Sequence, residues 1–116
     1  MKKSSIGVIF AILVLSVIFS SCATEKPLYT WGNYETQAYS HLKGESRITQ
    51  LEILEADYKL IASKEEAFPP GFFAHMGLLY LEAGNTGDAV TCFEKEKELF
   101  PEGTPFMDYL LKGLRR

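Results

Sequence analysis

The chain has 116 residues, of which 47% are hydrophobic and 23% charged, and its formal net charge is −3. This balance is typical of one small globular domain and argues against disorder throughout the chain. The first 21 residues contain two lysines and no acidic residue, so in the remaining 95 residues ten basic side chains face 15 acidic ones. A chain with a net charge near −5 is repelled by the negative phosphate backbone of nucleic acids. No nucleic acid is therefore expected as a partner.

Residues 1–21 are expected to form a signal peptide for export. Two lysines follow the first residue, and residues 6–19 then form a stretch in which only Gly7 and Ser16 are not strongly apolar. A helix needs about 20 apolar residues to span a bilayer, whereas a shorter stretch after a basic start is typical of a cleaved signal.

The segment that follows, Phe19-Ser20-Ser21-Cys22, resembles the processing site of bacterial lipoprotein precursors, although Phe19 replaces the usual aliphatic residue. The resemblance implies cleavage after Ser21, a diacylglycerol thioether at Cys22 and acylation of its freed amine, for example by palmitate. Ala23 stands where lipoproteins retained at the inner membrane usually carry Asp, which implies the periplasmic face of the outer membrane. The alternative is a plain secretory signal followed by an ordinary thiol.

Residues 22–30 lack helical periodicity and are expected to be a lipidated tether, followed by one α-helical domain over residues 31–116. Aromatic residues gather where the domain begins, at Tyr29, Trp31, Tyr34 and Tyr39. Trp31 either packs under the first helix, with Gly32 permitting the turn, or docks a partner beside the membrane. Aromatic residues dominate interface hot spots, so Trp31 and Tyr34 are candidate partner-binding residues.

Two helices are expected next. The first covers residues 34–43 and ends at Gly44, and Ser46 can cap the second. The second helix has an apolar stripe, formed by Leu51, Ile53, Leu54, Tyr58 and Ile61. A polar face is expected on its other side, formed by Glu52, Glu55, Asp57 and Lys59.

A helical hairpin is expected over residues 72–100. Gly84 ends its first helix, and Asn85 is the expected N-cap of the second, which is expected to run over residues 89–100 until Pro101 stops it. The spacing resembles the tetratricopeptide repeat, with matches at Phe73, Met76-Gly77, Tyr80, Gly84, Ala89, Phe93 and Pro101.

The resemblance to this repeat implies that the two helices approach closely at Gly77 and Ala89. Glu96 stands where the pattern has a further small residue. Residues 34–69 have the length of a degenerate repeat, and an amphipathic closing helix is expected to begin at residue 104, with Thr104 as its cap.

The same resemblance implies an inner groove lined by fixed positions of the first hairpin helix, which are Gly71, Ala74, Leu78, Leu81 and Glu82. Of these, Ala74, Leu78, Leu81 and Glu82 are candidate partner-binding residues. An apolar groove of this kind can take an amphipathic helix of a partner. Alternatively, the closing helix fills it with Leu110, Leu111 and Leu114 of the same chain.

Three longer segments resemble a family of small bacterial lipoproteins that has no assigned activity. They are Leu28-Tyr29-x-Trp31-Gly32-x-Tyr34, Pro69-Pro70-Gly71-x-x-Ala74-His75 and Glu94-x-Glu96-Lys97-x-Leu99-Phe100-Pro101. Members of that family are typically encoded beside a lipoprotein resembling the curli-secretion channel and beside a second small lipoprotein. The resemblance implies that these two proteins are partners in an envelope assembly.

Candidate catalytic and metal-binding residues are few. Cys92 and His75 lie on the two hairpin helices and could form a thiolate pair, but no orienting third group accompanies them. His41 and His75 are far apart in sequence, with no further ligand at metal spacing. Residues 94–98 alternate in charge and are expected to be a solvated helix face, or a binding site for a basic partner.

The sequence thus favours a non-enzymatic adaptor or assembly factor, anchored by lipid at the periplasmic face of the outer membrane. No catalytic residue, cofactor or metal is expected. One alternative is a pilotin-like carrier of an outer-membrane subunit, and another is a small enzyme that uses Cys92 and His75.

Overall fold

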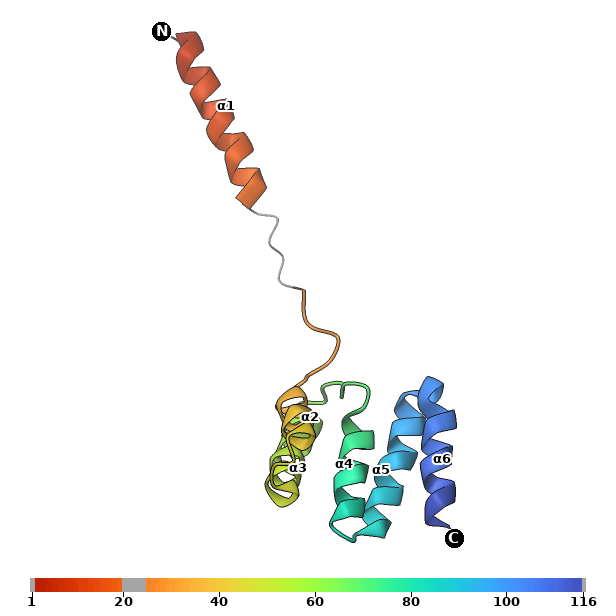
Figure 1. Cartoon of the computed structure of the whole chain (residues 1–116). Coiled ribbons are helices and arrows are strands. Elements are labelled where there is room, and N and C mark those ends of the chain that lie inside the picture. The colour runs from red at the N-terminus through yellow and green to blue at the C-terminus, as the bar shows by residue number, and fades with distance from the viewer. Residues whose placement is uncertain (1, 20–24, 116) are drawn as a thin grey trace.

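A computed structural model describes residues 2–19 and 25–115, and within these ranges every regular element is a helix. Helix α1 (Lys2–Phe19) covers the apolar stretch of the expected signal and lies apart from the other helices (Figure 1). None of the helices in this part of the chain is both long and apolar enough to cross a membrane. The expected lipidation site, Cys22, lies outside the described residues.

The domain consists of helices that follow one another side by side (Figure 1). They are α2 (Tyr34–Leu42), α3 (Arg47–Ser63), α4 (Phe72–Glu82), α5 (Thr86–Leu99) and α6 (Thr104–Leu114), with the short 3-10 helix η1 (Pro101–Gly103) before α6. Each helix packs against the next one along the chain. The expected all-α arrangement of helical hairpins with a closing C-terminal helix is therefore confirmed.

The helix boundaries follow local signals in the sequence. The hydroxyl of Ser46 accepts from the backbone N–H of Thr49, and the side-chain oxygen of Asn85 accepts from that of Asp88, so both expected N-caps are confirmed. Because Asn85 caps it directly, α5 begins at Thr86, three residues earlier than expected.

The prediction that Thr104 is the N-cap of α6 is wrong. Thr104 is already the first residue of that helix, and its backbone is helical, with φ −50° and ψ −46°. A capping residue needs a non-helical backbone. Here η1 continues into α6 without such a break, so the Thr104 side chain has no capping role.

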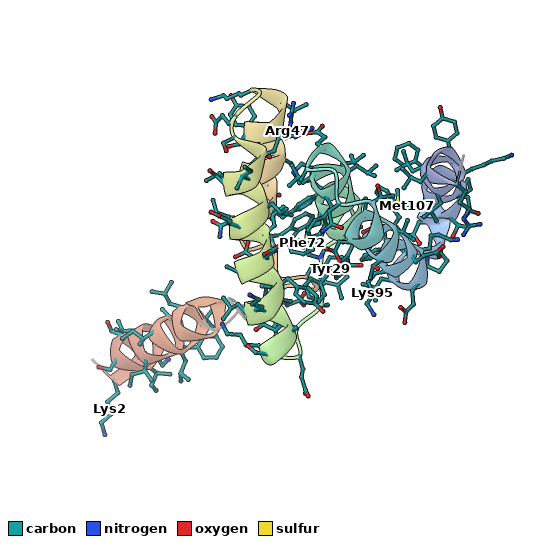
Figure 2. All side chains as sticks on the ribbon, turned by 90° about the horizontal axis from the view of Figure 1, so that it is seen from below. Lys2, Tyr29, Arg47, Phe72, Lys95 and Met107 are labelled. Atoms are coloured by element: carbon teal, nitrogen blue, oxygen red, sulfur yellow. The ribbon has the colours of Figure 1, made fainter. Side chains whose placement is uncertain are left out.

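The core forms two clusters around α4 and α5. The first joins α3, α4 and α5 and consists of Leu54, Ile61, Phe72, Phe73, Met76, Leu79 and Cys92. The second joins α5 and α6 and consists of Ala89, Phe93, Met107 and Leu111. Phe72 lies between α3 and α4, as Figure 2 shows. The α4–α5 hairpin thus belongs to both clusters.

Helices α4 and α5 approach each other closely at Gly77. A Cβ atom on this residue would lie 2.5 Å from Cε1 of Phe93, whose ring is fully buried. The aromatic ring therefore rests on the bare backbone of α4. The close approach expected from the helical-hairpin pattern is confirmed here.

Helix α3 differs from its expected two-faced pattern. Asp57, expected on the polar face, is only 7% exposed, whereas Tyr58 of the expected apolar stripe is 42% exposed. The Asp57 carboxylate is buried because it accepts hydrogen bonds from the backbone N–H of Asn33 at 2.6 Å and from the Asn33 side chain at 3.0 Å. Periodicity does not reveal a buried acid whose partners lie on another element.

The expectation of a solvated face over residues 94–98 is wrong at Glu96. This side chain is 5% exposed, and its carboxylate accepts from the backbone N–H of Gly71 at 2.6 Å and of Ala74 at 3.3 Å. The flanking residues do form exposed ion pairs, as Lys95 with Glu98 shows. Glu96 instead faces inward and holds the N-terminus of α4.

We predict that Gly77→Ala lowers the free energy of unfolding by about 1–3 kcal/mol, because the added methyl group overpacks the Phe93 contact. Gly87→Ala is the matched control, since Gly87 is also helical and its Cβ would meet nothing closer than 3.9 Å. Urea denaturation followed by circular dichroism measures both. Equal stability of the two variants would contradict the close contact.

Candidate functional site

Trp31 lies at the start of the helical domain, where it is 41% exposed. One face of its indole stacks on the Tyr34 ring, with centroids 6.1 Å apart, and Tyr29 meets it edge-on at 6.5 Å. Trp31 is thus packed on one side and open on the other. Leu28, three residues earlier in the chain, is 76% exposed.

The backbone around Trp31 is fixed by polar contacts with α3 and the loop after it. Gly32 has φ +51°, and a Cβ there would lie 2.7 Å from the Asp57 carboxylate that binds Asn33. Thr30 donates its backbone N–H to the carbonyl of Ala67 and its hydroxyl to Glu66. These contacts hold the segment before α2 in one position and leave the indole exposed.

Tyr34 faces inward from α2 and supports the indole. Its ring contacts Phe72 and His75 of α4, at centroid distances of 6.0 and 6.1 Å. Burial raises the pKa of Tyr34, and the nearby Glu96 carboxylate raises it further. The two candidate residues at this end of the domain therefore differ in burial. Trp31 lies at the surface, and Tyr34 lies beneath it.

The other candidate partner-binding residues lie on α4. Ala74, Leu78 and Leu81 are partly buried and pack against the second core cluster, to which Met107 and Leu111 of α6 belong. This placement favours the alternative in which the chain's own closing helix fills the inner groove. It also separates these residues from Trp31, because they face the α5–α6 side of the domain.

Glu82, the last candidate of this group, lies at the exposed end of α4. Its carboxylate forms an ion pair with Arg47 of α3, and His41 of α2 lies 3.7 Å from it. The residue therefore joins three helices at the surface.

His41 and His75 lie together, although they are far apart in sequence. Their ring centroids are 5.2 Å apart, and Nε2 of His75 is buried without a hydrogen-bond partner. Burial lowers the pKa of His75, as does the neighbouring His41. Among residues 2–19 and 25–115, no group of three or more His, Cys, Asp or Glu side chains is arranged to hold a metal ion. The two histidines instead form a contact between α2 and α4 that their separation in sequence does not reveal.

Cys92 does not face this histidine pair. It is buried in the first core cluster, near Tyr80. Burial raises the pKa of its thiol to about 11, with added effects from the carboxylates of Asp88 and Glu55. His75, by contrast, contacts Tyr34 and His41, so the candidate thiolate pair is not assembled.

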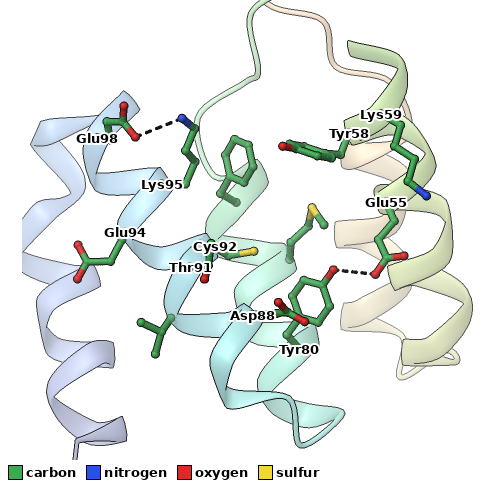
Figure 3. A pocket seen from close by; sticks show the side chains of 13 residues that line it. Glu55, Tyr58, Lys59, Tyr80, Asp88, Thr91, Cys92, Glu94, Lys95 and Glu98 are labelled. Carbon is green, nitrogen blue, oxygen red and sulfur yellow. Dashed lines mark hydrogen bonds and ion pairs between the residues drawn. The ribbon is translucent and has the colours of Figure 1, made fainter. Parts of the chain in front are cut away.

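An open groove lies between α3 and α5, with α4 as its floor (Figure 3). We call it the α3–α5 groove. Its volume is about 790 Å³, and it is lined by Glu55, Tyr58, Lys59, Phe73, Met76, Tyr80, Asp88, Val90, Thr91, Cys92, Glu94, Lys95 and Glu98. The sequence did not predict it, because Phe73, Met76 and Tyr80 have the spacing of ordinary core residues.

A family model described as Domain of unknown function (DUF4810) matches residues 28–110. The chain belongs to this family. No curated protein and no solved structure matches it.

The region shared with the DUF4810 family begins at Leu28 and includes both Trp31 and the α3–α5 groove. It extends through α2, α3, α4 and α5 into α6, while Cys22 precedes it. The family match therefore covers most of the helical domain.

We predict that Cys92 reacts slowly with iodoacetamide near pH 8. A pKa of about 11 leaves the thiol protonated below that pH, and relative to the ordinary value of 9.0 it reduces the thiolate fraction about 100-fold. The chain with Cys22→Ala contains no other cysteine, so mass spectrometry of the alkylated protein follows this site alone. Unfolded protein in urea is the control and should react at the ordinary rate. Equally fast alkylation of the folded chain would contradict the burial of Cys92.

Proposed function

We propose that this protein is a lipid-anchored adaptor at the periplasmic face of the outer membrane, which assembles an envelope secretion-channel-like complex without catalysing a reaction. The observation that carries the proposal is the exposed Trp31, held in place on Tyr34 at the end of the domain that follows the tether.

The anchor in this proposal is Cys22, lipidated after removal of residues 1–21. Each methylene group of an acyl chain contributes about 0.8 kcal/mol to the free energy of membrane binding when it is buried in the bilayer. Several acyl chains therefore anchor a protein firmly. From Cys22 to Trp31 the chain can span at most about 30 Å, since an extended residue covers about 3.3–3.6 Å. Trp31 therefore stays close to the membrane surface, where other anchored proteins are concentrated.

Trp31 suits a docking role because it is already ordered. A partner that covers the open face of the indole buries a large aromatic ring without first having to fix its backbone, which the Asp57–Asn33 contacts already do. Preorganisation of this kind favours binding. Leu28, three residues earlier in the chain, is a further exposed apolar residue.

The partners we propose are a channel-like lipoprotein and a second small lipoprotein. Their support is the likeness of this chain to small bacterial lipoproteins encoded beside such proteins, together with a helical-hairpin domain of tetratricopeptide-like pattern. Repeats of that type commonly present surfaces for other proteins. A thiol enzyme is disfavoured by the raised pKa of Cys92 and by the different surroundings of His75.

The test is purification of the lipidated protein from its own envelope in mild detergent, followed by identification of bound proteins. We expect both lipoproteins to co-purify with the native chain and to be lost, by at least tenfold, with Trp31→Ala. Tyr39→Ala is the matched control, because Tyr39 is an exposed aromatic residue of α2 outside the Trp31 contacts. Recovery of the native chain alone, or equal recovery with Trp31→Ala, would contradict the adaptor proposal.

A further inference from the structure

Helix α6 lies at one end of the row of helices and exposes two aromatic rings on its outer face (Figure 1). Its inner face is buried on α5 through Met107 and Leu111. On the opposite face Phe106 is 58% exposed and Tyr109 is 73% exposed. The terminal helix of a stacked helical domain ordinarily has a polar outer face. Adjacent exposed aromatic residues at this position are therefore typical of an interface.

A hollow lies beside the two aromatic residues on the same face of α6. Its volume is about 260 Å³, and it is lined by Tyr109, Leu110, Lys112 and Gly113. Gly113 contributes only backbone to it, and a Cβ atom there would meet nothing within 4 Å. Residues three or four apart share one face of a helix, so Phe106, Tyr109 and Gly113 form a stripe. This stripe has a projecting ring at one end and a hollow at the other.

The stripe is complementary to itself about a two-fold axis that passes between Tyr109 and Leu110. Phe106 and Gly113 lie on opposite sides of that point, each about 5 Å away along the helix. When two copies of α6 pack antiparallel about this axis, the Phe106 ring of each copy meets Gly113 of the other. The domain already contains a contact of this kind, since the ring of Phe93 rests on the backbone of α4 at Gly77.

The charges along one edge of the stripe fit the same arrangement. Lys112 forms no ion pair with an acidic residue in the described parts of the chain. Asp108 lies one turn before it and is bound by Lys97 of α5 at 2.6 Å. In the antiparallel pair, Lys112 and Asp108 of the second copy lie on the same edge, within about 2 Å of each other along the helix axis. The axis repeats this pairing, so the interface gains two contacts between opposite charges.

The two ends of α6 also differ in charge. Glu102 precedes the helix and is exposed, whereas Arg115 follows it and lies 3.9 Å from Glu94 of α5. Antiparallel packing places the basic end of each helix beside the acidic start of the other. The dipoles of the two helices then oppose each other, which is the favourable arrangement.

We propose that the α6 face formed by Phe106, Tyr109 and Gly113 joins two copies of this chain in an antiparallel dimer with two-fold symmetry. One face of an 11-residue helix is smaller than a standard interface, which buries about 800 Å² on each partner. The dimer is therefore weak in dilute solution, and it is favoured where copies are concentrated on one surface. This contact goes beyond the adaptor proposal, which rests on Trp31.

The test is sedimentation equilibrium of the chain in a mild detergent of matched density, which reports the mass of the protein alone. We expect the native chain to dimerise reversibly as its concentration rises. Gly113→Gln fills the hollow with a polar side chain, and Phe106→Gln removes the ring. Each change should weaken dimerisation at least tenfold. Gly87→Gln is the matched control, because Gly87 is also helical and its Cβ would meet nothing closer than 3.9 Å.

The charge contacts are tested with Lys112→Glu, which places an acid opposite Asp108 of the second copy. We expect this variant also to weaken dimerisation at least tenfold. Lys64→Glu is the control, because Lys64 is an exposed lysine at the end of α3. Circular dichroism and the unfolding midpoint establish that the variants stay folded, since every substituted side chain lies at the surface.

A native chain that stays monomeric up to about 1 mM would overturn the inference, because weaker association is not specific. A dimer that persists in Gly113→Gln would overturn it as well. So would a native monomer whose Phe106→Gln variant no longer co-purifies with another envelope protein, since α6 would then face that protein. These results leave the adaptor proposal standing, because that proposal is tested at Trp31. Conversely, Trp31→Ala should leave the dimer unchanged.

Discussion

The buried carboxylate of Glu96 is the contact on which the rest of the domain depends. Helix α4 begins after Gly71, which has no side chain to cap it, so the N–H groups at its start need an acceptor from elsewhere. Glu96 of α5 supplies that acceptor, and its negative charge suits the positive end of α4. Gly71 has φ +90°, and the Tyr34 hydroxyl occupies the place that a Cβ would take. Three helices, α2, α4 and α5, therefore meet at one carboxylate.

The two open surfaces of the domain follow from this arrangement. Tyr34 is fixed between α2 and α4 beside Glu96, and it supports Trp31 at the surface. On the other side, α5 is held against α4 by Glu96 and by the Phe93–Gly77 contact, while α3 packs on α4 but leaves the α3–α5 groove open. The α4–α5 hairpin thus belongs to both core clusters and links the support of Trp31 to the packing of α3 and α6.

Most of the fold could be predicted from the sequence, because helix ends and apolar spacing are local signals. Gly44, Ser46, Asn85 and Pro101 mark the helix boundaries through their own backbone or side-chain chemistry. Asp57 and Glu96 could not be placed in this way, because their partners Asn33 and Gly71 are more than twenty residues distant. The groove was missed for a related reason, since it depends on how far α3 and α5 lie apart across α4, and the spacing of apolar residues within one helix does not reveal that distance.

The most direct test of this account is the stability of Glu96→Gln compared with Glu98→Gln. Glutamine at position 96 keeps one acceptor oxygen but turns an amide donor toward the other N–H group, so we predict a loss of about 1–3 kcal/mol in the free energy of unfolding. Position 98 is exposed, and its change should stay within about 0.5 kcal/mol. The emission of Trp31, the sole tryptophan, should also shift to longer wavelength in Glu96→Gln. Equal stability and unchanged emission in the two variants would contradict the central role of Glu96.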